Sequence, residues 1–438
     1  MSYSIQEVIP RDVDKVLINR ANDTGTVYVV GAGLAGLSAA VSCVLKGYRV
    51  QVFESTNHAG GRCRSFKDKI LGRTINNGNH LILSGNLGVK EFLASLNTAD
   101  NFKAMHPVLF NFQDIIKNES WSLKPSNGRI PWWIFDPGKR IPRTSFIDYL
   151  ALLKLKFAKD ENIAALVNPS RPIFDRLWQP LSQAVLNTDA HEGSAALIWT
   201  MLSQTLLKGS DACRPMLTTA GLSAALVDPA ISFLTTNNAT LKFSMKLKSL
   251  DKNNDKIGSI NFNEQAIALK EKDKVILALP PNEISNLIPD IPTPTKTNAI
   301  VNVHFRLDDR PILPNNAPFI GIIGGVAHWL FKHDDIYSVT VSAANYFAEK
   351  SNEEISKIIW KEVAKVIGDD KRELPLFRVI REMRATFAQT PDENNRRPDS
   401  RTKWENLFLA GDWTNTGLPA TIESAIVSGQ KVAEILYK

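Results

Sequence analysis

The sequence predicts an α/β fold, in which a doubly wound nucleotide-binding domain is interrupted by a second, α+β domain. Three observations predict it: a strand, glycine turn, helix and strand in residues 26–54, an apolar strand near residue 275, and a last strand and helix after residue 405. Apolar residues make up 44% of the chain and charged residues 22%, which is typical of a globular protein. With 438 residues, the chain is long enough for two cores.

The first pattern is TVYVVGAGLAGLSAAVSCVLKGYRVQVFE. Gly31, Gly33 and Gly36 form G-x-G-x-x-G between a strand and a helix, and Glu54 ends the next strand eighteen residues after Gly36. In such a turn the glycines permit a tight bend, close approach of a pyrophosphate and close helix packing, and the acidic residue accepts from ribose hydroxyls. We therefore expect a dinucleotide without a 2′-phosphate. A strand, turn and helix that bind nothing is the alternative.

The segment HAGGRCRS favours FAD over NAD. Gly60 to Arg62 give a second close backbone approach and a cation directly after the ribose-binding acid. This combination suits the long pyrophosphate and ribityl arm of a flavin dinucleotide. A simple surface turn is the alternative.

The rest of the chain predicts an inserted domain. A polar turn, NNGNH at residues 76–80, leads into a largely helical region, and VILALPP predicts a buried parallel strand that stops at Pro280. The segments AIVNVHFRL, FIGIIGG, VAHWLF and YSVTVSAANYF predict an antiparallel sheet; residues 353–367 predict an amphipathic helix, ENNRRPDSRTKWE a polar linker, and residues 406–410 the final strand. We expect residues 1–88, 215–290 and 398–438 to form the FAD-binding domain, and residues 89–214 and 291–397 the substrate domain.

Two apolar segments have two interpretations each. RIPWWIFDPGKRIPRTSFIDYLALLKLKFAK combines aromatic side chains with bases, which fits either an interfacial membrane anchor or a tryptophan core with solvated lysines. SAALIWTMLSQTLLKG, residues 194–209, predicts either a buried core helix or the wall of an apolar tunnel.

Composition argues against several classes of protein. The three cysteines have no metal-ligand spacing, no run reaches the roughly 18 apolar residues of a membrane span, and residues 1–25 lack an apolar signal core. The net charge of +7 permits an anionic membrane surface or nucleic acid but requires neither. We expect a cytoplasmic protein without a metal and without a nucleic-acid partner.

Together, VVGAGLAGLSAA, GGRCRS, VILALPP and LFLAGDWTNTGLPATIESAIVSGQKVA resemble the flavin-dependent amine oxidase and phytoene desaturase superfamily. This resemblance implies a Rossmann-like FAD-binding domain of the amine-oxidase type, split in this order along the chain. NGNHLILSG, WQPLSQAVLNTDAHEGSA and REMRATFAQTP further resemble the hydroxysqualene dehydroxylases of bacterial hopanoid synthesis.

The resemblance implies a reaction and a location. Reduced FAD would replace the allylic hydroxyl of hydroxysqualene to give squalene. The alternatives are a polyene desaturase, which oxidises a carotenoid precursor, and a non-catalytic prenyl-lipid carrier. A squalene-type triterpene would come from the bilayer, so we expect peripheral association with the inner face of the cell membrane.

The same resemblance implies the cofactor-binding residues. The glycine turn would hold the pyrophosphate, Glu54 the adenosine ribose, the Leu247 backbone the adenine, and Asp412 the ribityl region. Free N–H groups near Thr421 would face the N1 and O2 edge of the flavin and favour its reduced form. The predicted set is Gly31, Gly33, Leu34, Ala35, Gly36, Glu54, Gly61, Arg62, Leu247, Gly411, Asp412, Thr421 and Ile422.

Catalysis is assigned to the loop at residues 76–80. The family tends to have Asp-Asn-Gly-Gln-His there, whereas this chain has Asn-Asn-Gly-Asn-His, which removes a carboxylate. His80 is the candidate proton donor, because it can titrate near neutral pH, and Asn79 is its neighbour in the loop. A structural histidine is the alternative for His80. Asp189, Glu192 and Glu423 are further candidates, although Glu423 suits the first turn of its own helix.

Overall fold

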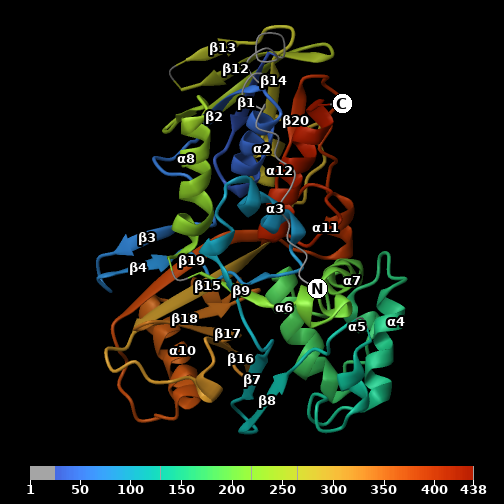
Figure 1. The fold of residues 1–438 in the computed structure, drawn as a ribbon, viewed down its shortest axis with the longest axis vertical. Coiled ribbons are helices and arrows are strands. Elements are labelled where there is room, and N and C mark those ends of the chain that lie inside the picture. Colours follow the sequence, from blue (N-terminus) through green and yellow to red (C-terminus); the bar gives the residue numbers. More distant parts are fainter. Residues whose placement is uncertain (1–24, 129, 219, 264, 438) are drawn as a thin grey trace, which may run out of the picture.

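The computed structural model describes residues 25–437 except residues 129, 219 and 264. Figure 1 shows an elongated molecule, with a parallel sheet and its helices at one end and a larger sheet beside a group of short helices at the other. The predictions for residues 1–24 and for Arg129, at the start of the aromatic segment, lie outside the described residues.

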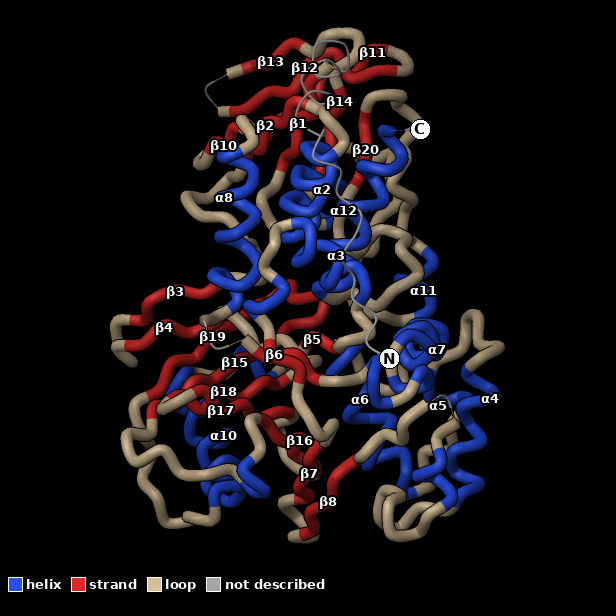
Figure 2. Tube along the Cα trace, viewed as in Figure 1, coloured by secondary structure: helices blue, strands red, loops and turns tan. Residues whose placement is uncertain are grey.

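Five strands form the parallel sheet, in the order β10-β2-β1-β14-β20 (Figure 2). Their pairings are all parallel, with β1 between β2 and β14, and β14 between β1 and β20. The predicted α/β fold is therefore confirmed. The strands are β1 (Thr26–Val30), β2 (Arg49–Phe53), β10 (Thr240–Lys242), β14 (Lys274–Leu277) and β20 (Leu407–Leu409).

Different layers cover the two faces of this sheet. One face packs against α2 (Leu34–Leu45), α3 (Leu87–Ser95), α8 (Asp228–Thr236) and α12 (Ile422–Tyr437). Apolar side chains of the other face pack against the small sheet of β11 (Leu247–Asn253), β12 (Lys256–Phe262) and β13 (Ala266–Ala268), and against α9 (Pro281–Leu287). Burial on both faces explains why β1 and β14 are almost wholly apolar in sequence.

Helices α2 and α12 cross with almost no space between them. A Cβ atom at Gly429 would lie 2.4 Å from the carbonyl oxygen of Ala35. The Ser38 hydroxyl donates a hydrogen bond of 2.8 Å to the carbonyl of Ile426 at the same crossing. The last helix is therefore fixed against the first one.

The larger sheet has seven strands in the order β19-β15-β18-β17-β16-β7-β8. The predicted antiparallel strands are present, but β7 and β8 from the preceding helical region extend the sheet, and β7 pairs with β16 in parallel. Helix α10 (Asn352–Ile367) packs on one face and ends, as predicted, at Gly368 with φ +76°. The strands are β7 (Phe110–Asp114), β8 (Glu119–Leu123), β15 (Thr297–Arg306), β16 (Phe319–Ile323), β17 (Trp329–His333), β18 (Ile336–Val341) and β19 (Phe377–Phe387).

Short helices around a separate apolar core make up the rest of the inserted region: α4 (Ala151–Leu155), α5 (Ile163–Leu166), α6 (Gln179–Leu186) and α7 (Ala195–Gln204). Helix α7 is shorter than the predicted segment 194–209. Its residues are buried or half-buried throughout, as either interpretation of that segment requires.

Smaller elements connect these layers. They are β3 (Ser65–Asp68), β4 (Arg73–Asn76), β5 (Ile82–Leu83), β6 (Lys103–Ala104), β9 (Pro215–Leu217) and α11 (Pro391–Asn395). Helix α3 crosses the boundary predicted at residue 88 and packs in the core of the parallel-sheet end. The division into domains stays a prediction.

The predicted polar linker at residues 393–405 is wrong in one respect, because several of its side chains are buried. Glu393, for example, is 2% exposed and accepts hydrogen bonds from the backbone N–H groups of Thr295 and Lys296. This segment is therefore packed structure rather than a solvated connection.

Candidate functional site

The glycine turn after β1 has the geometry that a dinucleotide requires. Gly31 has φ +105°, and a Cβ atom at Gly36 would lie 1.9 Å from the carbonyl oxygen of Gly31, so neither position tolerates a side chain. At Gly33, by contrast, a Cβ atom would meet nothing within 4 Å. The backbone is open on that side, as expected where a phosphate approaches it.

Helix α2 presents its positive end to the same open side. It begins after Gly33, and its first turn has no capping side chain and no acidic residue. Unpaired N–H groups and the helix dipole together favour an anion at such an end. The residues present therefore fit the pyrophosphate of a dinucleotide.

The second glycine segment lies directly against the first. The Gly60 N–H donates a hydrogen bond of 2.8 Å to the carbonyl of Ala32, and Gly60 forms a bridge with Gly33. Gly61, with φ +56°, approaches the Gly33 Cα closely enough that its own Cβ atom would lie 3.5 Å away. The two glycine motifs, which were predicted separately, thus form one continuous surface of backbone atoms without side chains.

Glu54 stands at the edge of this surface. One carboxylate oxygen accepts a hydrogen bond of 2.9 Å from the Ala32 N–H, and the other accepts from the Thr56 N–H at 2.9 Å. The backbone carbonyl of Glu54 accepts from Met245, two residues before Leu247 and the start of β11. The positions predicted for ribose and adenine are therefore neighbours.

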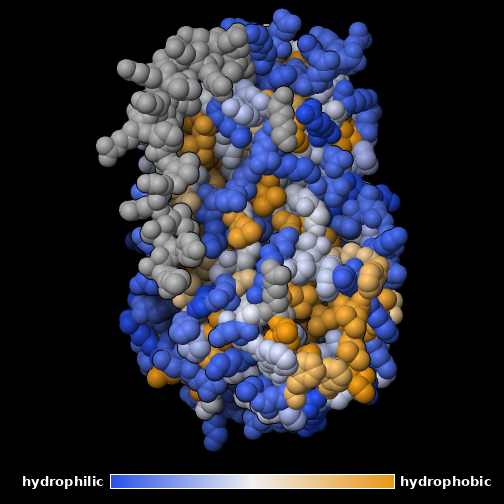
Figure 3. Space-filling model, turned by 45° about the vertical axis from the view of Figure 1, so that its right-hand side comes forward, coloured by the Kyte–Doolittle hydropathy of each residue, from blue (hydrophilic) through white to orange (hydrophobic). Residues whose placement is uncertain are grey.

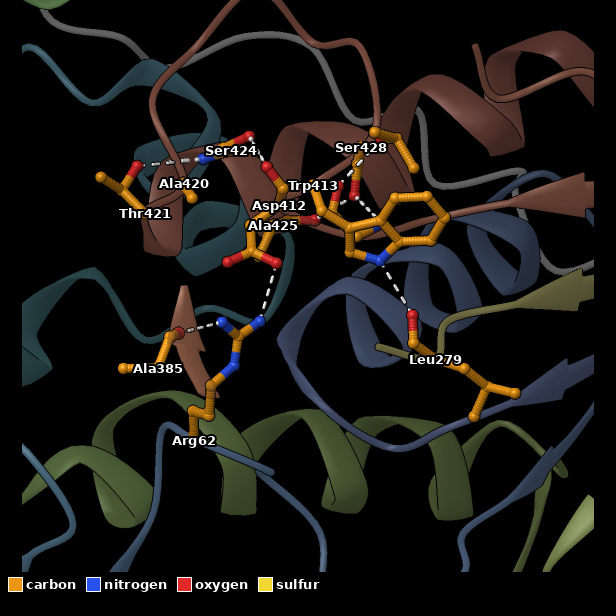
Figure 4. A network of polar contacts seen from close by, with 12 residues as sticks. Arg62, Leu279, Ala385, Asp412, Trp413, Ala420, Thr421, Ser424, Ala425 and Ser428 are labelled. Carbon is orange, nitrogen blue, oxygen red and sulfur yellow. Dashed lines mark hydrogen bonds and ion pairs between the residues drawn. The ribbon is translucent and has the colours of Figure 1, made fainter. Parts of the chain in front are cut away.

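Arg62 and Asp412 join the two ends of the chain (Figure 4). The Arg62 guanidinium donates to an Asp412 carboxylate oxygen at 2.7 Å and also to the backbone carbonyl of Ala385 in β19. The Asp412 carboxylate raises the pKa of Arg62, so this cation is permanent. In this structure the two predicted cofactor residues thus bind each other.

Gly411 lies between β20 and Asp412, where a side chain is excluded. A Cβ atom there would lie 2.5 Å from Nε1 of Trp413, and the Gly411 N–H donates to the hydroxyl of Ser428 in α12. These contacts fix the loop that carries Asp412.

The start of α12 lies beside Asp412, as Figure 4 shows. The Ser424 hydroxyl donates to the backbone carbonyl of Asp412 at 3.3 Å, and the Ser424 N–H donates to the Thr421 hydroxyl. Among the contacts of the described residues, no atom accepts a hydrogen bond from the backbone N–H of Thr421 or Ile422. This second positive helix end is open next to the Arg62 and Asp412 pair.

The loop at residues 76–80 rests on the polar face of the seven-stranded sheet. The Asn79 amide donates to the Thr340 hydroxyl at 3.0 Å, and Thr340 donates to Asn302 at 2.9 Å. The Asn302 amide in turn donates to the backbone carbonyl of Asn77 at 3.2 Å. Two neighbouring strands of this sheet, β15 and β18, and the loop are thereby held together.

His80 lies next to Arg62 and forms a hydrogen bond with the Arg62 backbone. The residue keeps exposed surface, while desolvation by the surrounding protein and the nearby Arg62 cation lower the pKa of His80 to about 4. A lowered pKa leaves the imidazole neutral at pH 7. The structure therefore places His80 beside the predicted cofactor residues. At neutral pH, however, its imidazole is not in the protonated form that would act as an acid.

Glu423 has a different role from the one expected. Its carboxylate accepts hydrogen bonds from the N–H groups of Gly88 and Val89, at 2.8 and 2.9 Å, at the start of α3. Burial raises the pKa of this carboxyl group. Glu423 therefore caps a neighbouring helix and not its own.

The other two acidic candidates lie in the helical part. Asp189 accepts hydrogen bonds from Gln179 and His191, and Glu192 is exposed. Neither residue makes a hydrogen bond or ion pair with Arg62, His80 or Asp412 among the described contacts.

Arg397 was missed by the sequence analysis. It is 6% exposed, and its guanidinium donates to the backbone carbonyls of Asp412 and Thr414, at 3.2 and 2.6 Å. The guanidinium thus supports the loop that carries Asp412. Its only sequence signal was a pair of arginines before a proline, which was assigned to the linker.

The described residues contain neither a membrane-spanning helix nor a cluster of metal ligands. None of the helices in residues 25–437, apart from the three positions left out, combines the length and apolar character needed to cross a membrane. Over the same residues, no three His, Cys, Asp or Glu side chains are grouped so that they could hold a metal ion.

Comparison with known proteins places these features in context. The family model for flavin containing amine oxidoreductases matches residues 34–436. Hydroxysqualene dehydroxylase from Zymomonas mobilis is 42% identical over 93% of this chain and 98% of its own length. The enzyme of the same name from Rhodopseudomonas palustris is 41% identical over 94% and 98%. A 15-cis-phytoene desaturase from Synechococcus elongatus is 22% identical over 94% and 95%.

The fold is also similar to solved structures. Cyclohexylamine oxidase from Brevibacterium oxydans superimposes with a TM-score of 0.71 over 94% of this chain and 99% of its own, at 13% identity. At that identity the likeness concerns the fold alone.

A substitution at the ion pair tests whether it forms part of a flavin site. Asp412→Asn keeps the shape but removes the charge that Arg62 faces, so we expect flavin affinity to fall about tenfold, which corresponds to about 1.4 kcal/mol. Titration of flavin-free protein with FAD, followed by absorbance, measures this. Asp290→Asn is the matched control, because Asp290 pairs with Lys403 at the same 2.7 Å but on the exposed surface. Equal affinity of both variants for FAD would contradict the assignment.

Proposed function

The chain belongs to the flavin containing amine oxidoreductases and, among them, to the hydroxysqualene dehydroxylases, and on this premise we propose that it converts hydroxysqualene to squalene with FAD. The observation that carries the proposal is identity of 41–42% to two such enzymes over nearly their whole length. The open glycine surface and the two free helix ends support FAD as the cofactor.

The reaction exchanges one bond of the substrate for another. The C–O bond at the allylic carbon breaks, the oxygen takes up a proton and leaves as water, and a C–H bond forms in its place. FAD, when bound in its reduced form, supplies the hydride and is oxidised by two electrons. The protein must position the substrate, exclude water from a cationic carbon and deliver one proton.

The residues at the two free helix ends would bind and tune the cofactor. The start of α2, with Gly33 and Gly61, would hold the pyrophosphate, and Glu54 the adenosine ribose. The N–H groups of Thr421 and Ile422 would face the flavin edge that is negative when reduced, so that α12 favours the hydride-donating form.

Proton delivery is assigned to His80, with Asn79 holding its loop on the sheet. His80 is the titratable side chain of this loop, and its place next to Arg62 supports the assignment. Its lowered pKa makes the protonated form scarce at pH 7 but strongly acidic when it forms.

Polyene desaturation is the second candidate, because a phytoene desaturase aligns over 94% of this chain. That reaction runs in the opposite redox direction on the same cofactor. The lower identity of 22% makes it the less favoured candidate.

We propose further that the protein takes its substrate from a membrane through an apolar face on the helical part. Figure 3 shows hydrophobic residues gathered on the lower part of the molecule, on the side where α4 to α7 lie in Figure 1. This apolar face consists of Trp132, Phe135, Phe146, Ile147, Leu150, Leu153 and Phe157, whose exposed fractions range from 38% to 74%.

The two tryptophans of this segment fit one interpretation each: Trp133 fits the tryptophan core, and Trp132 fits the membrane anchor. Trp133 is 5% exposed and packs edge-on against Tyr149 in the core, whereas Trp132 is 61% exposed. Exposed lysines at Lys154, Lys156 and Lys159 border the apolar face. Apolar side chains beside cations are typical of a surface that inserts shallowly into an anionic leaflet.

The reaction itself is tested by incubating purified protein with reduced FAD and hydroxysqualene without oxygen. We expect squalene and oxidised flavin in equal amounts, measured by mass spectrometry and absorbance. A desaturated product from phytoene, with no squalene from hydroxysqualene, would favour the desaturase. A protein that takes up no FAD would favour a non-catalytic carrier.

The role of His80 predicts a pH dependence. If protonated His80 is the acid, kcat rises as the pH falls from 7 toward 5, by up to about tenfold per pH unit, because more of the group is protonated. His80→Gln removes this rise, while the exposed His333→Gln keeps it. A wild-type kcat that is flat or increases with pH would remove His80 as the donor.

The apolar face is tested by sedimentation with anionic vesicles. The triple variant Trp132→Ser, Leu153→Ser, Phe157→Ser should bind at least about tenfold more weakly, because each side chain contributes roughly 1.5–3 kcal/mol when buried. The control Ile116→Ser, Ile312→Ser, Leu376→Ser changes residues that are as exposed but lie outside the apolar face. Equal loss in both variants would refute this choice of surface.

A further inference from the structure

Gln389 forms a buried junction between three parts of the molecule. It lies two residues after β19, has no exposed surface, and all four of its polar atoms are paired. Its side-chain amide donates to the carbonyl of Leu186 and accepts from the N–H of Ala420, both at 2.8 Å. Its backbone N–H donates to the Thr188 hydroxyl at 3.0 Å, and its carbonyl accepts from the Ser194 N–H at 2.8 Å.

Three of these contacts fix the helical part. Leu186 ends α6, and a carbonyl at a helix C-terminus has no partner within its own helix. Ser194 caps the N-terminus of α7, where its hydroxyl accepts from Leu197. Gln389 therefore ties the end of one helix and the start of the next to the strand β19.

The fourth contact reaches the proposed flavin site. Ala420 immediately precedes Thr421 and Ile422, whose N–H groups have no acceptor in the described part of the chain. The Gln389 side chain fixes the Pro419–Ala420 peptide, which directly precedes the two peptides that carry these N–H groups. No other side chain accepts from the Ala420 N–H among the described contacts.

We propose that Gln389 is a positioning residue, which aims the first N–H groups of α12 and thereby sets how strongly the protein prefers reduced over oxidised flavin. The proposal rests on the proposed function, in which α12 faces the flavin. Gln389 touches neither cofactor nor substrate in this account and acts only through the Ala420 peptide. Because Gln389 also binds Leu186 and Ser194, it links this preference for reduced flavin to the positions of α6 and α7.

The role requires a side chain that can both accept and donate a hydrogen bond. Methionine has a similar length but neither accepts from Ala420 nor donates to Leu186. Glutamic acid at a position without exposed surface would be protonated, because burial disfavours its charged form. It could then accept through its carbonyl and donate through its hydroxyl, as glutamine does.

The test compares the reduction potential of bound flavin in three variants. In Gln389→Met we expect the ratio of affinities for reduced and oxidised flavin to fall about tenfold, which lowers the two-electron potential by about 30 mV. Gln389→Glu should stay near the wild-type value at pH 6. Gln179→Met is the control, since Gln179 also makes two side-chain hydrogen bonds, to Asp189 and Ala190, but none to Ala420.

Each result decides something. An unchanged potential in Gln389→Met, or an equal shift in Gln179→Met, would overturn the proposal even if the enzyme makes squalene. A wild-type protein that takes up no flavin would instead overturn the proposed function. If Gln389→Met does not fold, Gln389→Glu serves alone: ionising its carboxyl as the pH rises from 6 to 9 should lower the potential more steeply than in wild type, and an identical slope would refute the role.

Discussion

Parallel pairing of β20 with β14 is the contact on which the proposed cofactor site depends. It places residues after 410 beside a turn that the chain makes near residue 31, and the Arg62 and Asp412 pair then spans the gap. At Gly429 the last helix lies in close contact with α2, and the Ser38 hydrogen bond to Ile426 joins the two helices there. Two helix N-termini consequently open toward the same region, one suited to a pyrophosphate and the other to a reduced flavin.

The inserted region completes this site with polar groups rather than with apolar ones. One face of β15 packs in the core under α10, while Asn302 on its other face holds the loop that carries His80. The same sheet supplies the Ala385 carbonyl that accepts from Arg62. A sheet with an apolar and a polar face can therefore be both a structural support and a wall of the site.

The parts of the fold that were predicted from sequence are those with local patterns. The strands at residues 26–30 and 49–53 follow from apolar runs interrupted by glycine, and these patterns need no distant partner to be recognised. Arg397, Gln389 and Glu423 were missed or misassigned, because each is defined by backbone groups that only folding brings near it, from 15 residues away for Arg397 to 335 for Glu423. Nor could the sequence tell Trp132 from Trp133, since adjacent identical residues differ only in the direction that tertiary packing gives them.

Strand β20 and helix α12 follow β1, β2 and β14 along the chain, and this order has a consequence for biosynthesis. A nascent chain can pair β1 with β2 and β14 well before residues 407–437 are made, but its half-built glycine surface then lacks both Asp412 and the α12 end. Exposed strand edges of that kind invite association with other unfinished chains. On the proposed function, FAD can be fully bound only after residues 407–437 are made, and the supply of FAD would then decide how many new chains gain the stability that a bound cofactor gives.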